Sequence, residues 1–121
     1  MSYQQSLPQV QLRTREVTIT PDANGTISQA LANNTLYTVA ASPALTYLSI
    51  SAAAGLKYCG IDFSTGATAP TFAYPAGWIW VGQGCNGGTF VPLASRSYRV
   101  GIEAYGESYI CNVQIVPEVV V

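Results

Sequence analysis

Few residues in this chain have the chemistry that catalysis needs. The sequence contains no histidine, so a serine nucleophile would lack the imidazole base of the usual catalytic triad. Hydrolysis of a glycosidic bond needs two carboxylates facing one cleft, and the nearest pair in the sequence is Glu103 and Glu107. These two flank an expected hairpin turn, where acidic side chains ordinarily provide solubility. We therefore expect no catalytic residues.

The sequence also contains few residues suited to binding a metal ion or to thiol chemistry. The segment Asp62–Gly66 offers oxygen atoms to calcium, but its single carboxylate supplies too little charge for a dedicated site. The three cysteines lack metal-ligand spacing, and their odd number argues against a disulfide framework. Cys59 and Cys111 share strand parity with apolar residues and are expected to be buried. Cys85 lies in a glycine-rich loop without a basic neighbour, and the sequence leaves its exposure open. No cofactor or metal is expected.

The composition narrows the range of partners. Five basic and six acidic residues are scattered along the sequence and leave a net charge of −1. Such a chain has no long-range positive field that would attract nucleic acid or an anionic membrane. No apolar stretch approaches the roughly 20 residues that span a bilayer, and the polar first residues carry no secretory signal. We therefore expect synthesis in the cytosol, with neither nucleic acid nor membrane as a partner.

The elements that position the remaining residues are expected to be short β-strands. Alternation of apolar and polar residues predicts strands at Val17–Thr20, Lys57–Phe63 and Arg99–Ala104. The last of these is expected to form a hairpin with the segment Tyr109–Ile115. Thr26–Leu31 fits either a short strand or one helical turn. No segment shows a sustained helical period, so helix is minor at most.

Turn signals recur at intervals of roughly 8–12 residues, which is typical of a sandwich or barrel. The sequence therefore predicts one all-β domain over residues 15–121, an antiparallel β-sandwich or jelly-roll-like domain. Residues 1–14 are rich in glutamine, contain one arginine and have little apolar content. We interpret them as an extended N-terminal arm.

Both ends of the sequence are suited to pairing with other chains. The arm carries a few apolar and aromatic side chains, namely Tyr3, Leu7, Val10 and Leu12. The C-terminal end has strong β-propensity and would invite edge pairing through Val119, Val120 and Val121. These ends could add as strands to a neighbouring subunit. Alternatively, both ends pair within the same domain.

Aromatic residues are the strongest candidates for a binding surface. Trp78 and Trp80 are two apart in an expected strand and share one face, with Ile79 and Val81 on the other. If the aliphatic pair is core, the tryptophans project outward, with two tyrosines nearby, Tyr74 and Tyr105. Exposed rings of this kind stack on sugars or anchor protein interfaces. Alternatively, the tryptophans fill the sandwich and the strand is buried on both faces.

The order of features from about Asn33 to Val113 is itself informative. The chain has an Asn-x-x-Tyr step at Asn34–Tyr37 and then a short apolar strand at Leu45–Ile50. An apolar strand that ends in Phe before a Ser/Thr-Gly turn follows at Ile61–Thr68. A Leu/Phe-x-x-Pro-x-Gly-x-x-Trp element at Phe72–Trp80 and a Tyr-containing hairpin at Ser97–Ile102 complete the series. In this order they resemble the β-sandwich domain of tailed-bacteriophage minor virion proteins, of the tail-fibre, baseplate or capsid-decoration type.

The resemblance implies a non-catalytic structural component of a virion, either a capsid decoration or a tail or fibre accessory. Its expected partners are other virion proteins and further copies of itself, with a trimer favoured by analogy. Assembly would use the arm from Tyr3 to Leu12 and an interface built on Trp78, Trp80 and nearby tyrosines. The alternative is a carbohydrate-binding module in which the same aromatics stack on a host surface glycan.

Overall fold

The computed structural model describes residues 14–116, in which all regular structure is β-strand. This confirms the all-β prediction, and Thr26–Leu31 is a strand rather than a helical turn. Within these residues no helix is long and apolar enough to cross a membrane. The strands follow the chain as β1 (Arg15–Ile19), β2 (Thr26–Leu31), β3 (Thr35–Val39), β4 (Tyr47–Ala52), β5 (Tyr58–Ser64), β6 (Thr71–Ala73), β7 (Ile79–Gly82), β8 (Cys85–Asn86), β9 (Thr89–Phe90), β10 (Ser97–Tyr105) and β11 (Ser108–Ile115).

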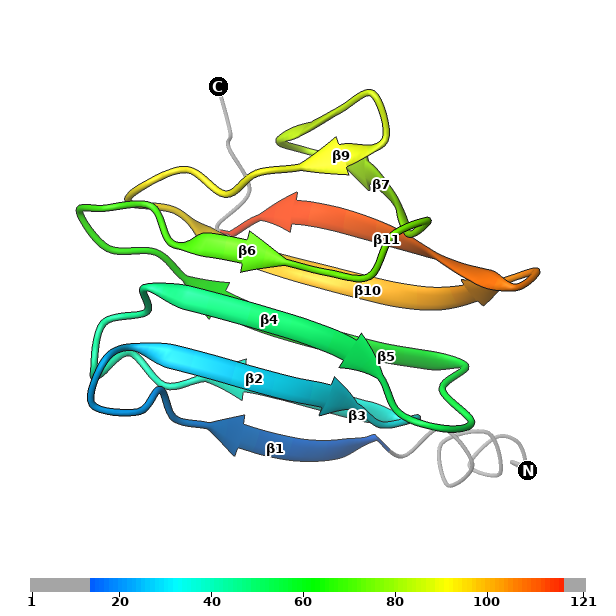
Figure 1. The fold of residues 1–121 in the computed structure, drawn as a ribbon, viewed down its shortest axis with the longest axis horizontal. Coiled ribbons are helices and arrows are strands. Elements are labelled where there is room, and N and C mark those ends of the chain that lie inside the picture. Colours follow the sequence, from blue (N-terminus) through cyan, green and yellow to red (C-terminus); the bar gives the residue numbers. More distant parts are fainter. Residues whose placement is uncertain (1–13, 117–121) are drawn as a thin grey trace, which may run out of the picture.

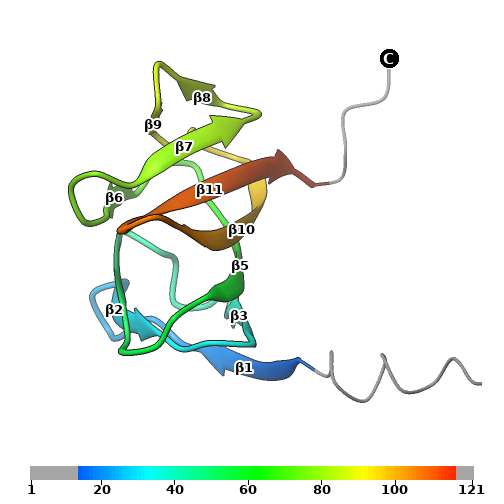
Figure 2. The ribbon, with the colours of Figure 1, turned by 90° about the vertical axis from the view of Figure 1, so that its right-hand side faces the viewer.

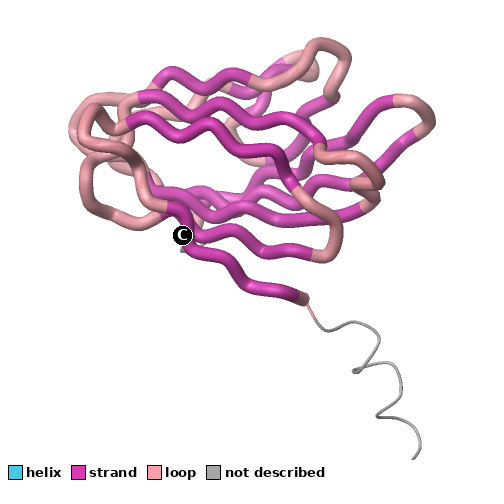
Figure 3. The backbone as a smooth tube through the Cα atoms, turned by 60° about the horizontal axis from the view of Figure 1, so that its bottom comes forward, coloured by secondary structure: helices cyan, strands magenta, loops and turns pink. Residues whose placement is uncertain are grey.

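Two sheets pack face to face as a sandwich. The large sheet has six strands in the order β1-β3-β5-β10-β11-β7, and the small sheet has three in the order β2-β4-β6. Figures 1 and 3 show the small sheet as a separate layer over the large one, with loops joining the layers at both ends of the strands. The short hairpin β8–β9 lies at the end of the molecule that also holds β7 (Figure 2).

Through its first six strands the chain alternates between the two sheets, so that each strand in one sheet is followed by a strand in the other. Successive strands of one sheet therefore run parallel: β1, β3 and β5 in the large sheet, and β2, β4 and β6 in the small one. The prediction of an antiparallel sandwich is wrong for these strands. Alternation and turn residues look the same in both arrangements, and strand direction depends on where the chain crosses between sheets.

The predicted C-terminal hairpin is confirmed. β10 and β11 pair antiparallel from Tyr98 opposite Ile115 to Tyr105 opposite Ser108. β10 also pairs antiparallel with β5, and β7 pairs parallel with β11. The hairpin thus lies between β5 and β7 in the large sheet.

The core lies between the sheets and follows the period-two alternation of the strands. On β5 and β10 the buried side chains are Cys59, Ile61, Phe63, Tyr98, Val100 and Ile102, each at most 2% exposed. Leu31 and Leu48 cover them from the small sheet and are fully buried. Burying one such aliphatic side chain contributes about 1.5–3 kcal/mol.

The small sheet has half as many strands as the large one, so part of the large sheet's inner face has no strand opposite. Large rings fill this region: Phe63, Phe72, Trp80, Phe90 and Tyr98 form a connected cluster with ring centroids 5.1–5.9 Å apart. The cluster joins strands of the large sheet to β6 of the small sheet and to β9. Aromatic bulk here takes the place of further strands.

The two ends predicted to mediate assembly lie outside the described residues. Tyr3, Leu7, Val10 and Leu12 precede residue 14, and Val119, Val120 and Val121 follow residue 116. Their roles stay sequence-based predictions.

Candidate functional site

The structure places the tryptophans inside the molecule. Trp78 is 7% exposed and Trp80 is 1% exposed, whereas Ile79 and Val81 on the other face are 40% and 39% exposed. The predicted sharing of faces is correct, but the outward-facing tryptophan pair is wrong. The alternative in which the tryptophans fill the sandwich is the one observed, although the strand's other face is not buried. The physical reason is that the small sheet has only three strands, so part of the large sheet's inner face has no strand opposite it. The large tryptophan rings fill this space.

The two tyrosines grouped with the tryptophans are separated in the structure. Tyr74 is half-buried and packs on Trp80 with ring centroids 4.6 Å apart. Tyr105 is 62% exposed at the end of β10 and makes no ring contact within residues 14–116. The four aromatics therefore form no common surface.

The outer face of the large sheet carries a different candidate site. Strand register places six outward-facing residues in one row across the sheet, in the order Val81, Asn112, Gly101, Gly60, Leu36 and Glu16. The two glycines lack side chains, so the row is hollow at its centre. We call this hollow the glycine trough. It is a shallow pocket of about 320 Å³ whose lining also includes Tyr58, Arg99 and Gln114.

Gly101 is in the interior of a central strand, where glycine costs roughly 0.5–1 kcal/mol relative to alanine. A Cβ atom at this position would meet no other atom within 4 Å. Its φ is not positive, so no turn or close approach inside the fold requires glycine here. At Gly60 a Cβ would lie 3.1 Å from the Leu36 side chain, which explains that glycine in part. Glycine inside a strand often marks a place where a ligand approaches the backbone.

Arg99, which lines the glycine trough, forms a bidentate ion pair with Asp62. The Arg99 guanidinium donates from Nε and Nη2 to the carboxylate of Asp62, with an Nη2–Oδ2 distance of 3.1 Å. The hydrogen bonds and the charge of Asp62 raise the pKa of Arg99, so the guanidinium stays charged. Asp62 holds the arginine in a fixed plane and neutralises it. The same contact occupies the one carboxylate that the sequence offered to calcium.

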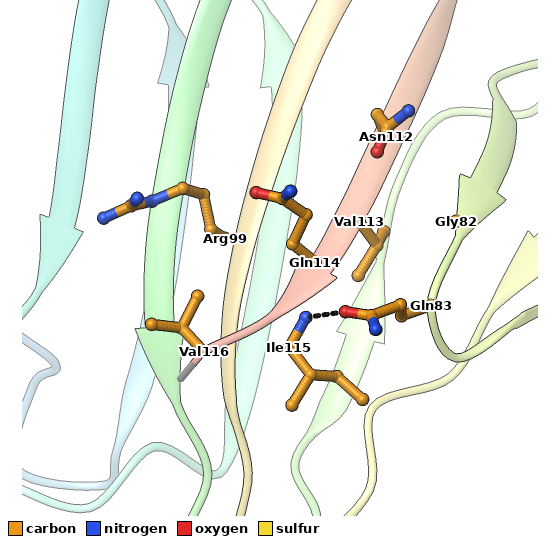
Figure 4. Close-up of a pocket in the computed structure, with 8 residues that line it drawn as sticks. All are labelled: Gly82, Gln83, Arg99, Asn112, Val113, Gln114, Ile115 and Val116. Atoms are coloured by element: carbon orange, nitrogen blue, oxygen red, sulfur yellow. Dashed lines mark hydrogen bonds between the residues drawn. The ribbon is translucent and has the colours of Figure 1, made fainter. Parts of the chain in front are cut away.

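Side-chain amides surround the other end of the trough. Figure 4 shows Arg99, Gln114 and Asn112 projecting from the adjacent strands β10 and β11. A second pocket of about 380 Å³ shares these three residues and extends to Gln83. Gln83 is anchored, because its Oε1 accepts a hydrogen bond from the Ile115 backbone N–H. Within residues 14–116 the amides of Asn112 and Gln114 make no hydrogen bond and can bind a ligand.

The edge strand β1 is a second surface with unused binding groups. The Arg15 N–H donates to Asn34, and the Ile19 carbonyl accepts from Ala40, so the odd-numbered residues bond toward β3. In a strand, the N–H and C=O of one residue point to the same side. Those of Glu16 and Thr18 therefore point away from the sheet, and no other described strand pairs with that edge.

The edge of β2 lies at the same end of the sandwich but is covered at its start and at its end. Asp22 covers its start, donating its N–H to the Thr26 carbonyl and accepting the Thr26 N–H at Oδ1. Gln29 covers its end by donating from Nε2 to the carbonyl of Ala30 at 2.9 Å. Asp22 and Gln29 thus occupy both outward groups of Thr26 and the carbonyl of Ala30 on β2, whereas Glu16 and Thr18 on β1 have no such cover within the described residues.

The residues weighed for catalysis are not assembled into a site. Glu103 is exposed on β10 and Glu107 is exposed in the following turn. No group of three or more acidic or cysteine side chains is placed to hold a metal ion within residues 14–116. Arg99, Asn112 and Gln114, which sequence analysis did not single out, are the polar groups that the fold brings together.

The cysteines differ in burial. Cys59 and Cys111 are fully buried, as predicted, and desolvation raises the pKa of each thiol to about 12. Cys85 is half-buried, and desolvation raises its pKa as well. None of the three forms a disulfide. The thiolate is the reactive form, so burial makes the first two inert in the native state.

We expect only Cys85 to react when the native protein is treated at pH 8 with an aromatic disulfide reagent. All three thiols should react after unfolding in guanidinium chloride, because unfolding restores ordinary thiol pKa values. The absorbance of the released thiolate gives the number of reacted groups. A Cys85→Ser variant should show no native reaction. Three equivalents released at one rate from the native protein would contradict this assignment.

Comparisons with protein-family models, with curated proteins and with solved structures found no match to this chain. The resemblance to tailed-bacteriophage virion domains therefore stays a prediction from the sequence.

Proposed function

We propose that this chain is a non-catalytic structural component of a bacteriophage virion, a capsid decoration or a tail or fibre accessory, that assembles by strand addition. The observation that carries the assembly step is the open edge of β1. The virion assignment rests on the sequence resemblance alone. Expected partners are copies of this chain and other virion proteins.

The β1 edge has the properties of a strand acceptor. Glu16 and Thr18 offer two N–H and two C=O groups in a regular row, which an added strand would pair with main-chain hydrogen bonds. Val17 and Ile19 are only half-buried against the core. A strand added beside β1 would cover these two side chains further. Because β2 is covered at its start and at its end, we place the acceptor at β1 rather than at the whole end of the sandwich.

A cyclic exchange explains how such an edge produces a closed oligomer. Each copy would offer its segment from Tyr3 to Leu12 to the β1 edge of the next copy, and the ring closes when the rotation allows it. Three copies are favoured by analogy with phage fibre and decoration proteins. The donated segment lies outside the described residues, so this part of the proposal comes from the sequence.

A proline at position 18 tests the proposal. The Thr18 N–H points to the open edge and makes no bond to β3, so Thr18→Pro should preserve the fold. It would remove a donor from the edge and place a ring in the path of an added strand. We expect full-length protein to sediment as an oligomer and Thr18→Pro as a monomer with unchanged circular dichroism.

Thr18→Val is the matched control, since it keeps the N–H and has high β-propensity. It should assemble like the unmodified chain. A monomer for the unmodified chain in sedimentation velocity, or an undiminished oligomer for Thr18→Pro, would refute assembly through this edge.

Glycan recognition, the alternative function, was expected to use Trp78 and Trp80, but both side chains are buried and cannot stack on a sugar. The residues that could serve it lie instead around the glycine trough.

A further inference from the structure

The strongest unexplained feature of the molecule is the empty space above Gly101. This strand interior tolerates a larger residue, since an added Cβ would touch nothing. Register places Gly60 directly beside it on β5. Two adjacent glycines with open space above one of them leave the backbone accessible to a ligand from the outer face.

The groups around this space narrow the class of ligand. β10 is paired on both sides, with β5 and with β11, so its backbone groups are already used and cannot add a peptide strand. Recognition must come from side chains, which here are the amides of Asn112 and Gln114, the Arg99 guanidinium and the Tyr58 ring. Planar amide and guanidinium groups hydrogen-bond to neighbouring hydroxyls, and an aromatic ring packs on the apolar face of a sugar.

The charge around the trough argues against an anion. Arg99 is paired with Asp62 through two of its nitrogen atoms. Glu103, opposite Tyr58 on the neighbouring strand, adds negative charge beside the trough. A phosphate or an acidic sugar would therefore find no uncompensated positive group, whereas a neutral polyol would satisfy the free amides.

We propose that the glycine trough binds a neutral saccharide, with the sugar ring over Gly101 and Gly60 and its hydroxyls on Asn112, Gln114 and Arg99. Tyr58, which is 53% exposed, packs on the edge or face of the ring. The volume of about 320 Å³ is at the small end of the range for ligand pockets, roughly 300–1,000 Å³, which fits one or two sugar units. The second pocket, toward Gln83, continues the same surface for a longer chain. This proposal uses a sheet face and does not depend on assembly at β1.

Gly101→Val is the decisive variant. It should fill the trough without disturbing the fold, because an added Cβ meets nothing within 4 Å, the pocket lies open above it and valine favours strands. Ser51→Val is its control, since it introduces the same side chain at an exposed position of β4 on the small sheet. Asn112→Ala leaves the trough open but removes one amide.

The probes are immobilised neutral oligosaccharides of glucose, galactose, mannose and N-acetylglucosamine, with sialylated and phosphorylated glycans beside them. We expect the unmodified chain and Ser51→Val to be retained on at least one neutral probe. Gly101→Val and Asn112→Ala should bind that probe at least about tenfold more weakly in titration calorimetry. Circular dichroism and thermal melting should show that all variants are folded.

Three outcomes would overturn the proposal. The first is no retention on any neutral probe, and the second is equal affinity of Gly101→Val and the unmodified chain. The third is retention on the acidic glycans alone. A self-association that Gly101→Val abolishes, with no sugar binding, would identify a second copy of the chain as the occupant instead. Because Thr18→Pro does not alter the trough, a monomeric Thr18→Pro protein that still binds sugar would separate this site from the assembly edge.

Discussion

Replacing Trp80 with alanine is expected to lower the free energy of unfolding by about 3–5 kcal/mol. The side chain is 1% exposed and contacts the rings of Phe72, Tyr74 and Phe90 at centroid distances of 5.3, 4.6 and 5.5 Å. These rings come from β6, from the segment that follows it and from β9, so Trp80 joins parts of the fold that no shared ladder connects. Removing it would leave a cavity that the rigid sheets cannot close.

Urea denaturation followed by far-ultraviolet circular dichroism measures this effect without depending on tryptophan fluorescence. Ile79→Ala is the control, because Ile79 immediately precedes Trp80 in the same strand and is 40% exposed. Its effect should stay below about 1 kcal/mol. Equal losses for the two variants would mean that Trp80 does not support the core. Trp80→Phe should be milder than alanine, since it keeps a ring and removes an Nε1–H that is buried without a partner in the described residues.

The strand containing Trp80 also shows which features of the fold could be predicted from the sequence. Its alternation predicts correctly that Trp78 and Trp80 share a face. Which face is inward depends on the opposite layer, and the sequence does not reveal that the small sheet has only three strands. Aliphatic residues are usually the better guide to the core, but here a space without strands required the larger rings. The local pattern predicts which residues share a face, and tertiary packing decides which face points into the core.

Strand direction escaped prediction for a related reason. The β10–β11 hairpin was predictable because its partners are adjacent in sequence and joined by a tight turn. The pairing of β1 with β3 is not local, because the whole of β2 and two turns intervene. Hydrophobic alternation is identical for parallel and antiparallel strands with one buried face. The sequence therefore predicts the all-β fold class but not the parallel direction of the first six strands.

The glycine trough depends on register, which is still harder to predict. Gly60 and Gly101 stand in separate strands, and only the pairing of β5 with β10 places them side by side. The sequence did contain one signal, since each glycine interrupts an otherwise strong strand pattern. The arm and the valine-rich end lie outside the described residues, so their role in assembly stays a prediction from the sequence.

Replacing Gly25 with alanine is expected to lower the free energy of unfolding by about 2–5 kcal/mol. Gly25 has a φ of +80°, a left-handed conformation that alanine adopts at a cost of roughly 1–2 kcal/mol. Its carbonyl accepts the N–H groups of Thr46 and Tyr47, so the turn before β2 packs directly against the start of β4. A Cβ atom would collide with the Ala44 carbonyl and lie 2.9 Å from two atoms of Thr46.

Gly106→Ala separates the two contributions to this loss. Gly106 has a φ of +62° in the β10–β11 turn, and a Cβ there would meet nothing within 4 Å. It should therefore show the conformational cost alone, and Gly25→Ala should exceed it by about 1–3 kcal/mol in urea denaturation. Equal losses would show that the turn yields without strain. A larger loss for Gly25→Ala would establish that the turn before β2 packs too closely against the residues leading into β4 to accept a side chain.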